Sequence, residues 1–221
     1  MNKIKAIVLF CFLSACQFDV TPTFYVRDIQ DVIEAGDTIS VPLVMSVPAS
    51  SLDECQSEIG QVLGILQTFG IKGEMQSCST DENNIFAVAR IELEAAVMSV
   101  EDPEQDRMKS VLALGLEQND DGSYGLYIAA NQKLEDAMNA IEAALVFASL
   151  DAANVGFIVT LNNDTRKEVS IFTYDSFVNG APYDAGEFAL KPRSELNIRA
   201  SDVGTNLFFN RGWYEVGSIV F

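Results

Sequence analysis

The amino-acid sequence predicts an α+β fold, in which two amphipathic helices pack on antiparallel or mixed sheet and an all-β segment ends the chain. Three observations support this class. Several segments alternate apolar and polar residues as strands do, two segments repeat apolar residues at helical spacing, and from about Val178 the chain changes to turns and short strands. Of the 221 residues, 48% are hydrophobic and 21% are charged, so the chain is long and apolar enough to bury a core.

The first 16 residues carry the features of a bacterial export signal. Lys3 and Lys5 precede the apolar segment 6–13, which is too short to span a bilayer. The sequence Leu-Ser-Ala-Cys that ends at Cys16 resembles the lipobox of bacterial lipoproteins. This resemblance implies that the chain is cut before Cys16 and that the cysteine carries two or three acyl chains, palmitate among them. The alternative is an ordinary secretory signal followed by an incidental cysteine.

The resemblance also implies a cellular address. Because two or three acyl chains anchor a protein stably, we expect the bilayer to be one partner of this protein, contacted through acylated Cys16. Gln17 after the cysteine favours the outer membrane, with the domain facing the periplasm. Residues 1–15 are then the signal peptide, and residues 16–36 are the acylated cysteine and a tether.

Residues 37–95 predict a β-α-β-β unit. The segment 38–47 alternates as a strand, and Pro42 within it suggests the edge of a sheet. Ser51 and Glu54 have the form of a capping box, which opens a helix that extends to about residue 69. Its apolar stripe includes Cys55. Two further strands are expected over residues 73–79 and 85–93.

Residues 109–176 predict a second such unit. Strands 111–117 and 123–129 flank Asn119-Asp120-Asp121-Gly122, which is a strong turn signal. Asn131 caps a helix, and strands 155–161 and 168–174 follow it. Adding 82 to positions in the first helix aligns its apolar residues with those of the second. Residues 37–177 are therefore expected to form one α+β domain with a possible internal duplication, 37–95 and 109–176.

Residues 178–221 are expected to form a small β-subdomain. Aromatic residues flank the turn-like segment 210–212, and Arg and Trp are enriched among residues that dominate binding energy at interfaces. We therefore single out Arg211, Trp213 and Tyr214 as candidate partner-binding residues at a hairpin tip. The alternative is that these aromatics form the core between two short strands.

The four cysteines predict one disulfide. Cys11 leaves with the signal and Cys16 is acylated, so Cys55 and Cys78 remain as a pair in an oxidising compartment. A redox or metal pair lacks the C-x-x-C spacing and additional ligands.

Composition excludes several classes of function. The chain has no His, so triads with His, His general bases and His-ligated metals are absent. The formal net charge of −18 repels nucleic acid and anionic head groups, so we expect no nucleic-acid partner and expect the acyl anchor alone to contact lipid. The sequence contains no motif typical of nucleophilic, metal-dependent or nucleotide-dependent enzymes. We expect no cofactor and no catalytic residues.

Two acidic segments raise the question of a cation site. Glu117, Asn119 and Asp121 match the first positions of a calcium loop, but position 12 is Ile128 where a bidentate Glu is needed. The acidic run 101–106 is explained equally well as a charged loop. We therefore predict no metal site.

Beyond the lipobox, short segments resemble small uncharacterised lipoproteins of bacteriophages and prophages. They are Phe18-Asp19-Val20, Asp28-Ile29, the run 36–42, and Val47-Pro48 ahead of Cys55. The resemblance implies an envelope role such as exclusion of competing phage. We expect a non-catalytic module that binds or blocks an unknown envelope protein. The alternatives are an assembly or pilot lipoprotein of an envelope machine and, third, a carboxylate-based envelope hydrolase.

Overall fold

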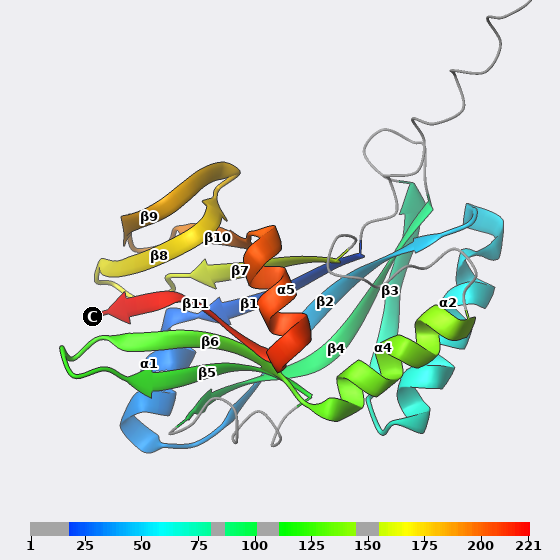
Figure 1. Ribbon diagram of the computed structural model, residues 1–221, viewed down its shortest axis with the longest axis horizontal. Coiled ribbons are helices and arrows are strands. Elements are labelled where there is room, and N and C mark those ends of the chain that lie inside the picture. The colour runs from blue at the N-terminus through cyan, green and yellow to red at the C-terminus, as the bar shows by residue number, and fades with distance from the viewer. Residues whose placement is uncertain (1–17, 81–86, 101–110, 145–154) are drawn as a thin grey trace, which may run out of the picture.

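The computed structural model describes residues 18–80, 87–100, 111–144 and 155–221 (Figure 1). These residues form four helices and eleven strands, so the α+β class is confirmed, with strands dominant. The elements are β1 (Phe18–Tyr25), α1 (Val26–Ala35), β2 (Ile39–Ala49), α2 (Leu52–Thr68), β3 (Gly73–Thr80), β4 (Ala87–Ser99), β5 (Leu112–Gln118), β6 (Tyr124–Ala130), α4 (Gln132–Ala144), β7 (Val155–Asn162), β8 (Val169–Val178), β9 (Ala181–Leu190), β10 (Glu195–Ala200), α5 (Asp202–Arg211) and β11 (Trp213–Val220).

Nine of the strands close into a barrel. Their order is β10-β7-β1-β2-β4-β5-β6-β11-β8, and a pairing between β8 and β10 completes the ring. The two remaining strands extend the sheet, because β9 pairs with β8 and β3 pairs with β4. Side chains alternate between the two faces of each strand, so one row of apolar residues points inward. Closure of the sheet buries these rows against one another. In β2, for example, Val41, Leu43, Met45 and Val47 are all buried.

The last step of closure is irregular. The strands β11 and β10 share one edge of β8, with β11 pairing at residues 170–173 and β10 at residues 176–178. Between these two stretches lies Asp175 with a φ of 46°. Upstream of Gly217, β11 pairs with β6 and not with β10. The helix α5 contacts β11, β10, β7 and β8, so it covers the opening that the two strands leave.

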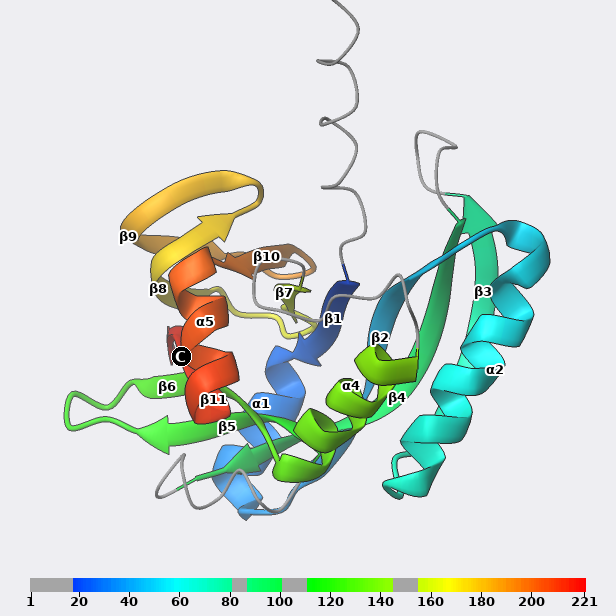
Figure 2. The ribbon, with the colours of Figure 1, turned by 45° about the vertical axis from the view of Figure 1, so that its right-hand side comes forward.

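A helix closes each end of the barrel. α1 follows β1 directly and lies at the end where β1 and β7 finish, and its Val26, Ile29 and Val32 are fully buried. α5 follows β10, which runs antiparallel to β7, so α5 lies at the opposite end, where β1 begins. We refer to these as the α1 end and the α5 end. Figure 2 shows α1 and α5 as separate covers of the curved sheet.

Long strands carry the sheet beyond the barrel. β2, β4 and β3 extend toward α2, which packs on all three strands and also contacts α4 (Figure 1). Ser51 caps α2 as predicted, since its Oγ accepts a hydrogen bond from the Glu54 N–H at 3.2 Å. A disulfide joins Cys55 on α2 to Cys78 on β3, with the Cα atoms 6.3 Å apart. The bond therefore fastens the buried side of α2 to a strand that is paired on one edge.

The structure corrects four sequence predictions. Residues 18–35, which the sequence analysis assigned to a tether, are β1 and α1 of the barrel. The prediction from local patterns did not identify β1, because this strand is stabilised by pairing with β2 and β7, which come later in the chain. Pro42 lies on β2, a central strand rather than an edge. The missing N–H is tolerated there because the pairing of β2 with β1 ends at Leu43, so Pro42 is paired with β4 alone.

The other two corrections concern the division of the chain. The proposed repeats do not share a topology. In the first, β2 and β3 both pair with β4, whereas in the second β7 and β8 pair with neither each other nor β6. Residues 178–221 are not a separate subdomain, because β10 and β11 pair with β7 and β6 and complete the barrel. The apolar residues of α2 and α4 have similar spacing because both helices are amphipathic and bury one side. This spacing is common to amphipathic helices and is no sign of duplication.

Candidate functional site

The predicted residues Arg211, Trp213 and Tyr214 lie where α5 ends and β11 begins. They are not at a hairpin tip, because residues 202–211 are helical. Ser201 caps this helix by accepting the Gly204 N–H at 3.2 Å, and Gly212, with a φ of 76°, ends it. The aromatic run within α5 suggested a strand because aromatic residues favour strands. The N-cap serine and the terminal glycine are the sequence signals that identify the helix.

The three predicted residues do not form one surface. Trp213 and Tyr214 are consecutive residues of a strand, so their side chains point to opposite faces of the sheet. Tyr214 points inward and is 8% exposed. Trp213 is half-buried on the outer face, and Arg211 at the end of α5 is exposed. The structure therefore keeps Arg211 and Trp213 together and assigns Tyr214 to the interior.

On the outer face, Trp213 is held between a cation and a second aromatic ring. The Arg211 guanidinium carbon lies 6.0 Å from the centre of the Trp213 ring, within the range of a cation–π interaction. The Tyr127 ring of β6 meets the Trp213 ring edge-on, with their centres 5.7 Å apart. Tyr127 lies flat over Gly125, where a Cβ atom would come within 2.7 Å of the ring. The glycine thus leaves the space that Tyr127 occupies.

Two carboxylates fix the tyrosines of this face. The Tyr127 hydroxyl donates to Glu117 of β5, and the Tyr174 hydroxyl of β8 donates to Glu215 of β11. Burial, followed by these hydrogen bonds to carboxylates, raises the pKa of both tyrosines well above the usual value of 10. Both phenols are therefore protonated at neutral pH and serve as hydrogen-bond donors. The two Tyr–Glu pairs restrict the rings before any partner arrives.

Phe172 completes the face. It lies two residues before Tyr174 on the same side of β8, with ring centres 6.3 Å apart, and is 43% exposed. We define the aromatic face as Tyr127, Trp213, Tyr174 and Phe172, with Arg211 at its margin. The sequence analysis missed Tyr127, Tyr174 and Phe172. The signal in the sequence was the alternation of Phe172 and Tyr174, but only the pairing of β6, β11 and β8 brings these two together with Tyr127 and Trp213.

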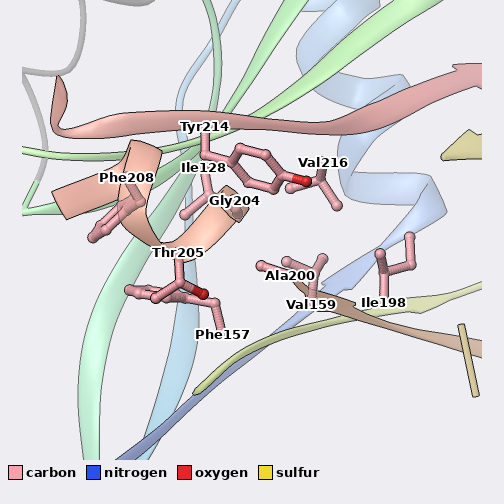
Figure 3. Close-up of a pocket in the computed structure, with 10 residues that line it drawn as sticks. All are labelled: Ile128, Phe157, Val159, Ile198, Ala200, Gly204, Thr205, Phe208, Tyr214 and Val216. Carbon is pink, nitrogen blue, oxygen red and sulfur yellow. The ribbon is translucent and has the colours of Figure 1, made fainter. Parts of the chain in front are cut away.

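The inner side holds a small apolar cavity at the α5 end. Figure 3 shows the Tyr214 side chain extending from β11 past Gly204 of α5. A Cβ at Gly204 would come within 2.5 Å of the Tyr214 ring, so this glycine permits the close approach of helix and strand. The cavity has a volume of about 10 Å³, room for roughly one water molecule. Its lining residues are Ile128, Phe157, Val159, Ile198, Ala200, Gly204, Thr205, Phe208, Tyr214 and Val216.

The Tyr214 hydroxyl is buried without a hydrogen-bond partner within the described part of the chain. Burial, then the negative charges of Asp175 and Glu215, raises the pKa of Tyr214 to about 12. A second hollow of about 110 Å³ lies between α4 and α5, with apolar Leu134, Met138 and Phe208 at its base and polar Asn131, Glu135 and Asn139 among its other lining residues. Phe208 borders both spaces.

Of the two candidate cation segments, the structure describes only the β5–β6 turn that holds Asp121. Asp121 accepts hydrogen bonds from both the N–H and the hydroxyl of Ser123, so its carboxylate shapes the β5–β6 turn. These bonds lower the pKa of Asp121. The acidic run 101–106 and the predicted lipidation site Cys16 lie outside the described residues. Within residues 18–80, 87–100, 111–144 and 155–221, no group of three Cys, Asp or Glu side chains is placed to hold a metal ion.

The fold and the face together define a strand-dominated α+β protein with a closed sheet and an outward aromatic cluster. A family model described as "Domain of unknown function (DUF7424)" matches residues 18–221, and the chain belongs to this family. No curated protein and no solved structure matches the chain. In the part of the chain that the structure describes, no helix combines the length and apolar character needed to cross a bilayer.

Proposed function

We propose that this protein is a membrane-anchored envelope lipoprotein whose domain binds or blocks another protein and performs no chemistry. The observation that carries the proposal is the aromatic face with Arg211 at its margin. Tyr, Trp, Phe and Arg are the residue types enriched at protein interfaces, and Trp, Tyr and Arg dominate the binding energy there. Exclusion of competing phage is one form that such blocking would take.

The rigidity of the face supports this role. Side chains that are held before binding lose less entropy when a partner docks. Tyr127 and Tyr174 are held by Glu117 and Glu215, and Trp213 is held by its contacts with Tyr127 and Arg211. The face also spans three strands of a closed sheet, β6, β11 and β8, which is a stiff support.

The anchor is the second part of the proposal and rests on the lipobox at residues 13–16. A Cys16→Ser variant is expected to stay as an uncut precursor or to leave the membrane fraction. The measurement is detergent-phase partitioning together with the mass of the amino terminus. Normal processing and unchanged partitioning of the variant would contradict the anchor.

Binding is tested by site-specific photo-crosslinking in a Gram-negative host. A photo-reactive phenylalanine analogue replaces Phe172 in the full-length chain, and a matched control carries it at Leu52, which is 48% exposed and lies on α2. The expected result is one discrete crosslinked product at Phe172 that the control does not form. Trp213→Ala is expected to weaken binding by about 2 kcal/mol, or about 30-fold, and to reduce that product.

Two results would contradict protein binding through this face. One is equal crosslinking at Phe172 and Leu52. The other is a discrete product at Phe172 that Trp213→Ala leaves undiminished. A thermal melt of Trp213→Ala accompanies the experiment, so that loss of binding is distinguished from loss of folding.

A further inference from the structure

The distance between the proposed anchor and the folded domain is very short. Gln17 alone separates Cys16 from Phe18, the first residue of β1, and Phe18 is buried and paired with Val155 of β7. Two residues of fully extended chain span at most about 7 Å. If Cys16 is acylated, as proposed above, the beginning of β1 therefore lies close to the bilayer surface, and the domain cannot rotate freely away from it.

The helix α5 lies at this same end of the barrel. Its Phe208 packs on Phe157 of β7, with ring centres 4.3 Å apart, and Phe157 is the pairing partner of Val20 on β1. Because neighbouring strands are about 4.8 Å apart, α5 lies on the order of 10 Å from a residue only four positions after Cys16. Figure 1 shows α5 across the strands near the beginning of β1.

The exposed side of α5 differs from the other described helices in charge. α5 carries one acid, Asp202, and one base, Arg211, and so has no net charge. Each of the helices α1, α2 and α4 has two or more excess acids. The acidic surface elsewhere is repelled by anionic head groups, whereas α5, with no net charge, is not.

The exposed side of α5 also carries an apolar side chain. Gly204, Thr205 and Phe208 face the barrel and are buried. Val203 in the first turn points away from them and is 62% exposed, the largest exposed fraction among the bulky apolar residues of the described chain. An exposed apolar residue on a helix without net charge, next to an acyl anchor, suits the head-group region of a bilayer.

We propose that the outer side of α5 rests on the surface of the bilayer in which Cys16 is anchored. The short spacing at Gln17 enforces this contact, and the overall acidity confines it to the α5 end. The expectation from net charge, that the acyl anchor alone contacts lipid, then fails at this one helix. The opposite, α1 end of the barrel faces away from the membrane.

The test uses full-length, lipidated protein in vesicles of phosphatidylethanolamine and phosphatidylglycerol, with and without bromine-labelled acyl chains. Trp213 is the single tryptophan of the chain. With Trp213→Phe as background, one variant carries Val203→Trp and its matched control carries Tyr25→Trp, at a 39% exposed position on the α1 end. We expect brominated lipid to reduce the fluorescence of the tryptophan at 203 by about two-fold and to leave that at 25 unchanged.

Vesicle flotation separates failure of this inference from failure of the anchor. Protein that does not float with vesicles contradicts the proposed lipoprotein. Protein that floats but shows equal quenching at positions 203 and 25 contradicts the α5 contact. A flexible Gly/Ser linker of about 12 residues inserted after Gln17 is expected to preserve flotation and abolish quenching at 203. Quenching that persists with the linker would contradict the role of the short spacing.

Discussion

The two ends of the barrel are closed by helices of equal length, yet they are built differently. At the α1 end, Val26, Ile29 and Val32 of α1 are fully buried, and the loops around the helix are joined by a buried asparagine whose polar atoms are all bonded. At the α5 end, a buried tyrosine hydroxyl has no partner in the described chain, and hollows lie on two sides of Phe208. The difference indicates that the α1 end maintains the fold. The α5 end, where we propose contact with a membrane, is less tightly packed.

Asn163 is the centre of the α1 end. Its side-chain nitrogen donates to the carbonyls of Lys167 and Leu190, each at 2.8 Å, and its oxygen accepts from the N–H and hydroxyl of Thr165. The loop after β7 and the loop after β9 are thereby tied together. Asp164 next to it accepts the backbone N–H of Arg27 at 3.0 Å, which caps α1 from 137 residues away.

Removal of Asn163 is the largest effect that we predict. Asn163→Ala leaves buried carbonyl groups without donors and should lower the free energy of unfolding by about 3 kcal/mol or more. Asn206→Ala is the matched control, because the Asn206 side chain makes one exposed bond to the Asp202 carbonyl, and about 0.5 kcal/mol or less is expected. Urea unfolding of the protein measures both, and similar losses would remove the distinction between the two ends.

The close approach at Gly204 gives the next largest effect. Gly204→Ala places a methyl group against the Tyr214 ring and should cost about 2 kcal/mol through overpacking. Gly64→Ala on α2 meets no atom within 4 Å and should instead stabilise the protein by up to about 1 kcal/mol through helix propensity. Thermal melts of the two variants are expected to shift in opposite directions. A stabilised Gly204→Ala variant would show that the α5 end is looser than described.

Tyr214 provides the most direct contrast with Asn163. Because its hydroxyl is buried without a bonding partner, Tyr214→Phe should leave stability unchanged or raise it by about 1 kcal/mol. Tyr174→Phe is the control, because the Tyr174 hydroxyl donates to Glu215 and its loss should cost about 1 kcal/mol. Denaturant midpoints measure both changes. A loss above about 1 kcal/mol in Tyr214→Phe would show that the hydroxyl is bonded in solution.

The smallest effect concerns alkaline pH. The pKa of Tyr214 is raised to about 12 in the folded protein against about 10 in an unfolded chain, so between these values the unfolded state binds fewer protons than the native state. The contribution of Tyr214 to the free energy of unfolding is therefore fully present below pH 10 and is lost as the pH rises toward 12. Tyr214→Phe should fall less steeply over this interval, as measured by unfolding at fixed pH values. Identical slopes would show that Tyr214 does not contribute.

Parts of the fold were predictable because their signals are local. The helix 52–68 follows from the capping box at Ser51 and its apolar stripe, and the β5–β6 hairpin follows from the turn residues 119–122. Asn131 caps α4 as expected, since its Oδ1 accepts the N–H groups of Lys133 and Leu134. Each of these features depends on residues a few positions apart, whose energies act before the rest of the chain is placed.

The candidate site was predictable only in part. The residue types at Arg211 and Trp213 suggested a binding surface, and the structure keeps these two in contact. Their partners Tyr127, Tyr174 and Phe172 come from strands that are distant in sequence. Tyr214 was assigned to the surface because the face on which its side chain lies depends on where β11 begins. The helix α5, which was not predicted, sets that starting point.

By itself, the sequence determined the acidic charge, two of the helices, a hairpin and the cysteine pair that forms the disulfide. Tertiary structure decided the closure of the sheet, in which β1 pairs with β2 and β7, and the division of Trp213 and Tyr214 between its two faces. The physical reason is range. Caps, turns and apolar stripes act over a few residues, whereas strand pairing is selected by burial of the whole inner surface, to which every part of the chain contributes.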